Sequence, residues 1–212
     1  MRSGNIWRWP PEQANTDSGT GIRQTNICRY KGIDMTDKPK TLYHGSQSEI
    51  TDGFIRMRPG HINGMQTPIT AAFATPSYRH ARLYAAMRII SNGWKWPKGI
   101  DTLYVERISP NISNSKAYVY EVSSDGFIPD GDDYYCLNDV PILKTYEIDV
   151  MQEIRNGNIK VYVLQDKVNF DDLTEEESLA LWRKTCKTGN FKRYLPEESN
   201  QIATFLNNGM DR

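Results

Sequence analysis

The sequence predicts a strand-rich α+β domain. From Thr41 onward, short β-branched and aromatic runs recur, most of them bounded by Gly, Pro, Asn, Asp or Ser, and this is the pattern of strands. One helical pattern interrupts these runs early in the chain, and after Asp166 the pattern becomes helical. We therefore expect a sheet-based core against which helices pack.

Six segments have strand character, with alternating or continuous apolar residues over four to eleven positions. They are Thr41–His44, Ala71–Thr75, Thr102–Ile108, Lys116–Val122, Val140–Val150 and Asn158–Leu164. No internal repeat or low-complexity tract accompanies them, so a solenoid or other repeat architecture is not expected.

Three helices are expected from capping and spacing signals. Pro76-Ser77 offers an N-cap to a helix whose apolar face is Ala81, Tyr84, Ala85 and Ile89. A capping box over residues 174–177 opens a second helix that runs through Trp182 and Arg183. A third begins near Pro196, carries Ile202, Phe205 and Leu206, and stops at Gly209. The last two are expected to cover one face of the sheet.

The first forty residues differ from the rest, because they contain no run with a strand or helix period. Seven basic and four acidic residues give this segment a small positive excess. We interpret residues 1–40 as an arm or linker, with Met35 as an alternative start, and Trp7 and Trp9 as possible anchors on a partner. Residues 41–166 are then the core and residues 167–212 a helical extension.

Bulk composition excludes several classes of protein. The 212 residues suit one domain with appendages, and 26 basic against 26 acidic residues leave no net field to attract nucleic acid or an anionic membrane. The apolar stretches are too short for a membrane span, and the mean hydropathy is −0.64. The three distant cysteines predict neither a disulfide framework nor a metal site, so a cytoplasmic location is expected.

Three local patterns follow one another in a suggestive order. Leu42-Tyr43-His44-Gly45-Ser46 is a strand that ends in a polar His and a Gly, and residues 72–76 lead into the alanine-containing helix. The strand at residues 117–122 then runs into an acidic loop over residues 125–133. In this order the patterns resemble the diphtheria-toxin/PARP-like ADP-ribosyltransferases, and among them the rifampin ADP-ribosyltransferase branch, over roughly residues 41–165.

The resemblance implies a split, strand-rich α+β core that binds NAD as a cosubstrate. His44 would hold a ribose hydroxyl, because a neutral imidazole donates at one nitrogen and accepts at the other. Gly45 would let its main chain approach the nicotinamide carboxamide, with Tyr43 and Ser46 beside it. Phe73 or Tyr84 would stack on the nicotinamide ring.

A carboxylate near the reacting ribose completes the implied site, because it can stabilise developing positive charge or orient the nucleophile. Asp130 is the first candidate, with Glu147 in reserve, and Asp132 and Asp133 remain open alternatives in the same acidic segment. Taken singly, the acidic residues of this loop are typical of a solvated turn, Glu147 of the outer face of a strand, and His61 and His80 of the surface.

Three functions from different classes stay open. The first is a mono-ADP-ribosyltransferase that moves ADP-ribose from NAD to a macromolecule, with a protein as the expected acceptor. The second is a catalytically degenerate transferase fold that serves as a binding or assembly module. The third is an RNA 2′-phosphotransferase-like enzyme, which would need basic residues such as Arg79, Arg82 and Arg88 to converge on a phosphate; their spacing does not form one clean helix face.

Overall fold

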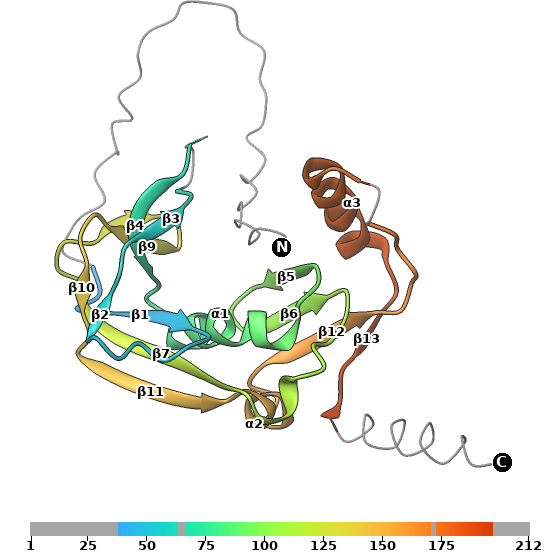
Figure 1. Cartoon of the computed structure of the whole chain (residues 1–212), viewed down its shortest axis with the longest axis horizontal. Coiled ribbons are helices and arrows are strands. Elements are labelled where there is room, and N and C mark those ends of the chain that lie inside the picture. The colour runs from blue at the N-terminus through green and yellow to red at the C-terminus, as the bar shows by residue number, and fades with distance from the viewer. Residues whose placement is uncertain (1–37, 63–66, 171–172, 197–212) are drawn as a thin grey trace, which may run out of the picture.

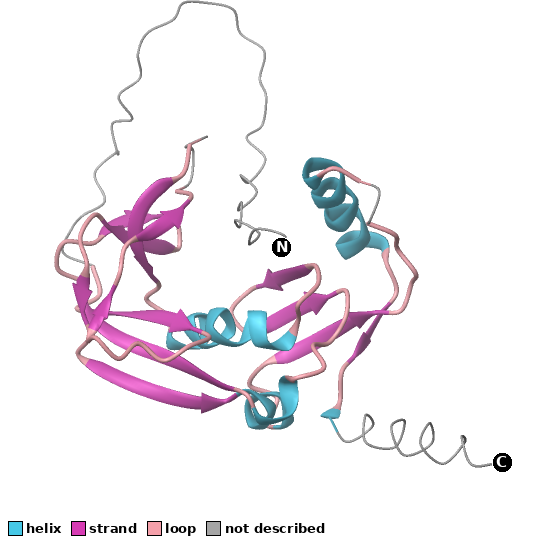
Figure 2. Cartoon of the chain, viewed as in Figure 1, coloured by secondary structure: helices cyan, strands magenta, loops and turns pink. Residues whose placement is uncertain are grey.

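The computed structural model describes residues 38–62, 67–170 and 173–196, and its architecture is shown in Figure 1. Helices make up 23% and strands 38% of the structure, and Figure 2 shows short helices set among several strand layers. The predicted α+β class is therefore confirmed.

The central sheet is antiparallel and has the order β1-β7-β11, formed by Thr41–Ser46, Lys116–Ser123 and Lys144–Asp149. His44 pairs with Tyr120, and Thr145 pairs with Tyr120 from the other side. β1 and β7 confirm predicted strands, and β1 continues two residues past His44.

Helix α1, Tyr78–Ile90, covers one face of this sheet. The Ser77 side chain caps it by accepting a hydrogen bond from the His80 N–H, so the predicted helix and its cap are both confirmed. Ala81 and Ala85 are fully buried on the side of α1 that meets β1. This helix and the sheet enclose the larger of the two hydrophobic cores.

A second sheet has the order β3-β4-β9-β8 and consists of Arg58–Gly60, Ile69–Ala74, Asp133–Cys136 and Ile128–Asp130. Beside it, β2 (Phe54–Ile55) pairs with β10 (Val140–Pro141). The interpretation of the acidic residues in 125–133 as a solvated turn holds for Asp125 and Asp132, which are exposed turn residues. It is wrong for Asp130 and Asp133, which belong to β8 and β9. Gly131 has a φ of 63° in the connection, a conformation that glycine adopts without strain.

The third sheet, β13-β12-β6-β5, is formed by Phe191–Arg193, Lys160–Leu164, Thr102–Val105 and Lys95–Lys98. β6 and β12 are parallel, whereas the outer pairs are antiparallel. The predicted strand at Thr102–Ile108 ends three residues early. A short 3-10 turn over Ile112–Asn114 connects toward β7.

The predicted strand Val140–Val150 is wrong as a single element. It divides into β10 and β11, and Val150 instead begins helix α2, Val150–Arg155. The Asp149 side chain caps α2 by accepting from the Gln152 N–H. A local cap therefore outweighed the β-branched character of Val150.

The C-terminal segment joins the third sheet. The capping box of Thr174 and Glu177 is present and opens helix α3, Glu175–Thr188, as predicted. After α3, β13 pairs with β12, which makes residues 191–193 a strand of the sheet and not part of a purely helical extension. The expected helix from Pro196 onward and the expected arm before residue 38 lie outside the described residues.

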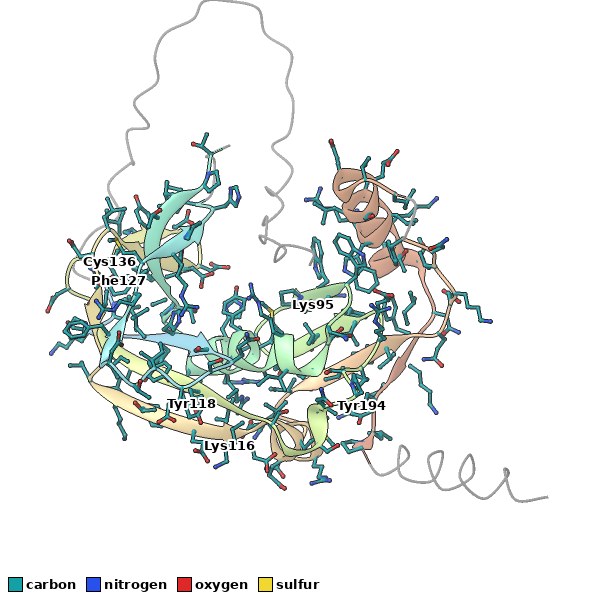
Figure 3. The ribbon with its side chains drawn as sticks, in the orientation of Figure 1. Lys95, Lys116, Tyr118, Phe127, Cys136 and Tyr194 are labelled. Carbon is teal, nitrogen blue, oxygen red and sulfur yellow. The ribbon has the colours of Figure 1, made fainter. Side chains whose placement is uncertain are left out.

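The two cores meet along β1 and β7. Leu42 and Val122 belong to the smaller core, which also holds Phe127 and Cys136; these last two are neighbours at one end of the molecule in Figure 3.

Cys136 and Cys186 are free thiols, and Cys28 lies outside the described residues. Among the described helices, none has the length and apolar character needed to cross a bilayer.

Candidate functional site

Alternation along β1 sends its side chains to opposite faces of the sheet. Tyr43 packs in the larger core, 5.6 Å from the ring of Tyr78 on α1. Leu42 lies in the smaller core, and His44 shares that side, with its ring 6.5 Å from the ring of Tyr120. His44 therefore points away from the face that α1 covers.

Gly45 allows β1 to approach α1 very closely. A Cβ atom at this position would lie 2.7 Å from the main-chain nitrogen of Ala85 and against the carbonyl oxygen of Ala81. Both obstacles are main-chain atoms of a helix and cannot turn aside. The glycine of the Tyr-His-Gly-Ser segment is thus required by packing, whatever else it does.

Strands β1 and β4 meet and then separate. Tyr43 and Thr75 exchange two main-chain hydrogen bonds of 2.8 and 2.9 Å. In an antiparallel pair, alternate residues direct their N–H and C=O groups to the same edge, so those of Gly45 and Phe73 also face into the gap between the strands. Within the described residues, no main-chain hydrogen bond joins Gly45 to Phe73.

We call the place where β1 and β4 separate the β1–β4 wedge; it is bounded by the main chains of Gly45 and Phe73 and by the His44 side chain. Among the described residues, one hydrogen bond connects the two sides of the wedge. It joins His44 Nδ1 to the main-chain oxygen of Phe73 at 2.7 Å. A carbonyl oxygen only accepts hydrogen bonds. Nδ1 therefore carries the proton, and Nε2 of the neutral ring is an acceptor.

The environment of His44 favours the neutral form. Burial of the ring is the main cause that lowers its pKa, and the positive charge of Arg58 lowers it further, while the hydrogen bond to Phe73 acts in the opposite direction. Arg58 belongs to β3, which pairs with β4 at Ala71. At neutral pH His44 is thus an uncharged donor to Phe73 with Nε2 in acceptor form.

A second cluster lies on the face of α1. The Tyr84 hydroxyl donates to Asp133 Oδ2 at 3.4 Å, and Tyr84 stacks on the His80 ring at 4.3 Å. Thr75 also hydrogen-bonds the Asp133 carboxylate. Asp133 Oδ1 is buried and has no hydrogen-bond partner among the described residues.

The same surroundings perturb the titration of the cluster. Burial raises the pKa of Asp133 to about 6, helped by the negative charges of Asp132 and Asp130 and opposed by the hydrogen bonds from Thr75 and Tyr84. Burial also raises the pKa of Tyr84 and lowers that of His80. A buried carboxyl that titrates near neutrality is suited to exchanging protons.

An open depression of about 470 Å³ adjoins this cluster. Its walls come from the start of α1, from the β8–β9 hairpin and from the turn between β5 and β6, and include Thr75, Ser77, His80, Asp132, Tyr134 and Ile100. His80 was expected at the surface, but it is half-buried and forms part of this wall.

The structure unites the predicted site residues in part. His44 contacts the main chain of Phe73, but the Phe73 ring follows Thr75 onto the face of α1 and packs over Gly60. Tyr84 meets Asp133 on that same face. The His44 ring therefore lies on one side of the sheet, and the rings of Phe73 and Tyr84 lie on the other. Within the described part of the chain, His44 is connected to that other side only at the wedge, through its hydrogen bond to the Phe73 main chain.

The other predicted site residues, Ser46, Asp130 and Glu147, have no contact with His44 or Tyr84 among the described interactions. The Ser46 hydroxyl donates to the Ser48 carbonyl at 2.7 Å, and Asp130 pairs across the hairpin with Asp133. Glu147 is exposed on β11 and forms an ion pair of 2.7 Å with Lys116, as the strand alternation indicated. His61 is only partly exposed.

The three arginines considered for an RNA phosphate do not converge. Arg79 pairs with Asp101 at 2.7 Å, whereas the buried Arg82 pairs with Glu153 at 2.8 Å and donates to the Asn158 carbonyl. Arg88 is exposed at the other end of α1. This arrangement does not support a phosphate site on α1.

Sequence reasoning did not single out Asp133 or Thr75. Asp133 was one of four aspartates in an acidic segment, and nothing local distinguished it. The signal that could have found it is the run Asp133-Tyr134-Tyr135-Cys136, which has the composition of a strand and would place Asp133 at its entry.

Comparison of the chain with known protein families, with curated proteins and with solved structures finds no match.

Proposed function

We propose that the chain is a mono-ADP-ribosyltransferase, which transfers ADP-ribose from NAD to a macromolecular acceptor and releases nicotinamide. The observation that carries the proposal is the β1–β4 wedge, in which the N–H and C=O of Gly45 make no main-chain hydrogen bond to Phe73 in the described part of the chain and lie next to a neutral histidine. A carboxamide has one acceptor and a donor pair, and is complementary to such a main-chain edge.

Gly45 fits this role for two reasons. It has no side chain to obstruct the edge, and its contact with α1 fixes the main chain in place. Tyr84 lies on α1 between Ala81 and Ala85, the two positions on which Gly45 rests. A flat nicotinamide ring held by the Gly45 edge would therefore have an aromatic neighbour, as stacking requires.

His44 supports the proposal through its tautomer. With Nδ1–H bound to Phe73, Nε2 is available to accept a hydrogen bond from a ribose hydroxyl. A charged histidine would repel the positive charge that develops on the ribose as the bond to nicotinamide breaks. The lowered pKa of His44 avoids that repulsion at neutral pH.

We propose Asp133, in place of Asp130, as the carboxylate of the site. The bond between nicotinamide and ribose breaks with its electron pair going to the nicotinamide nitrogen, and the acceptor then forms a new bond to the same ribose carbon and loses a proton. A carboxylate with a pKa of about 6 takes up such a proton at neutral pH.

The direct test is release of nicotinamide from labelled NAD, with and without cell extract as the acceptor source. We expect His44→Ala to lower the rate at least about tenfold, because a positioned hydrogen bond to the reacting sugar is lost. His44→Asn serves as the matched variant, since it keeps a donor for the Phe73 carbonyl but lacks the acceptor at the Nε2 position.

Equal, large losses in both variants, with unchanged thermal unfolding, support a role of His44 in the reaction. Recovery of full rate by His44→Asn would reduce His44 to a structural contact. If the wild-type chain neither binds NAD in calorimetry nor releases nicotinamide, the transferase proposal fails and the degenerate binding module becomes the better hypothesis.

A further inference from the structure

Aromatic side chains line one face of the third sheet. Leu103, Val105 and Val161 point into the larger core, so alternation sends Tyr104 and Tyr162 to the opposite face. Their rings stack at 5.3 Å, and Tyr104 also meets Phe191 of β13 edge-on at 4.9 Å. Trp96 joins them, because β5 pairs Trp96 with Tyr104.

Helix α3 covers only part of this face. Trp182 of α3 is fully buried against Phe191 and Phe170, and Phe170 in turn contacts Trp94. Figure 1 shows α3 above the third sheet, joined to it through β12 and β13. Trp96, Tyr104 and Tyr162 keep partial exposure, so aromatic surface remains on the side of β5 and β6.

Three basic side chains surround the two tyrosines on the same face. Lys98 lies over the Tyr104 ring at 5.7 Å, and the register places Arg193 opposite Tyr162. Lys160 is the third basic residue, and it shares this face because it lies two residues before Tyr162 on β12. Lys98 and Arg193 are exposed, and the Lys160 side chain is 43% exposed.

Two acidic residues near this face, Asp101 and Glu106, form ion pairs, one of them with Lys160 of the face itself. Asp101 pairs with Arg79 at 2.7 Å and with Lys160 at 3.3 Å. Glu106 pairs with Arg107 and accepts from the Trp94 N–H. The local balance is therefore positive, although the whole chain has a formal charge of zero.

We propose that this surface, the tyrosine face, defined by Trp96, Lys98, Tyr104, Lys160, Tyr162 and Arg193, binds single-stranded nucleic acid. Partly exposed rings on a sheet can stack on unpaired bases, and flanking cations neutralise the phosphates between them. A duplex would keep its bases out of reach of the rings. A carbohydrate would use the rings but not the three cations.

The depression described above lies on the other face of β5. Pro97, which pairs with the core residue Leu103, lines it, whereas Trp96 and Lys98 belong to the tyrosine face. Gly99 and Ile100, just past the end of β5, also line the depression, so a strand bound on the tyrosine face would have to pass around this end to reach Asp132. Its use as the ADP-ribose acceptor, in place of the expected protein, rests on the proposed function, whereas the binding itself does not.

The test is fluorescence anisotropy with the full chain, without NAD, using labelled oligo(U) and oligo(dT) of about 12 nucleotides, a length within the range that one such surface covers. We expect saturable binding whose affinity falls about sevenfold to twentyfold as salt rises from about 50 to 200 mM, as two to three phosphate contacts predict. The two oligonucleotides distinguish RNA from DNA.

Variants locate the binding surface. Tyr104→Ala should weaken binding at least about tenfold, and Tyr104→Phe should retain it, because stacking needs the ring and not the hydroxyl. Tyr118→Ala is the matched control, since Tyr118 is a half-exposed tyrosine of β7 that Figure 3 places well away from Lys95 of β5. Lys98→Ala should reduce the salt dependence, whereas Lys144→Ala, which removes the lysine over Tyr146, should not.

The proposal is overturned if the full chain binds neither oligonucleotide at low salt. Binding that survives both Tyr104→Ala and Lys98→Ala would also overturn it, because the nucleic acid would then occupy another surface. Loss of binding in Lys98→Ala, whose side chain is exposed, supports the proposal even if Tyr104→Ala fails to fold. Because NAD is absent, failure of the transferase chemistry leaves this result unaffected.

Discussion

Replacing Asp133 with asparagine is expected to lower the rate of nicotinamide release at least about a hundredfold, the usual scale for removing a catalytic carboxylate or charge stabiliser. Asparagine retains an acceptor for Tyr84 and Thr75, so the shape of the site is preserved. What disappears is the negative charge and the capacity to take up a proton.

The wild-type rate should also depend on pH in a defined direction. Because the pKa of Asp133 is raised to about 6, the carboxyl is protonated and inactive below that pH. The rate of nicotinamide release should therefore rise about tenfold per pH unit up to about pH 6 and then level off. Asp133→Asn should abolish this rise.

The same substitution should stabilise the fold at pH 7. A folded-state pKa above the value of 3.8 for an exposed aspartate means that the stability associated with protonated Asp133 is lost as pH rises through about 6. Asparagine avoids the burial of this charge, and we expect the free energy of unfolding at pH 7 to increase by about 1 to 2 kcal/mol. The advantage should vanish below about pH 4.

Two variants show whether the effect belongs to Asp133. Asp125→Asn makes the same change at an exposed position of the neighbouring turn and should alter neither rate nor stability. Asp130→Asn tests the carboxylate that the sequence favoured. A larger loss of rate in Asp130→Asn than in Asp133→Asn would assign the catalytic role to Asp130.

The sequence predicted those elements whose signals are local. Ser77 and Thr174 begin helices because a side-chain oxygen caps the main chain within three residues. These caps are determined by neighbours in the chain. Gly45 was expected to let the main chain approach a ligand, whereas the observed close approach is to Ala81 and Ala85 of α1, a contact between residues distant in sequence.

Elements that depend on distant partners were not predicted. β13 is three residues long and exists because β12 is beside it, and β5 contains Pro97, which weakens a strand pattern. Asp133 differs from Asp130 and Asp132 through its contacts with Thr75 and Tyr84, which are 58 and 49 residues away in sequence. A local sequence pattern cannot predict contacts between residues so far apart in the chain.

The second large effect is expected at Trp182. Its side chain is fully buried between α3 and the third sheet, with ring centroids 6.3 Å from Phe170 and 6.1 Å from Phe191. Trp182→Ala should lower the free energy of unfolding by about 3 to 5 kcal/mol, because it leaves a cavity that main-chain elements cannot close. In thermal unfolding this corresponds to a midpoint about 6 to 20 °C lower.

Trp182→Phe is the informative control. The indole Nε1 is buried without a hydrogen-bond partner among the described residues, so phenylalanine retains most of the ring contacts and removes an unsatisfied donor. Its cost should be about 1 kcal/mol or less, because the lost volume and the lost desolvation penalty oppose each other. An unchanged unfolding midpoint in Trp182→Ala would instead mean that α3 and β13 form a separate appendage. The pairing of β13 with β12 and the burial of Trp182 argue that α3 unfolds together with the third sheet.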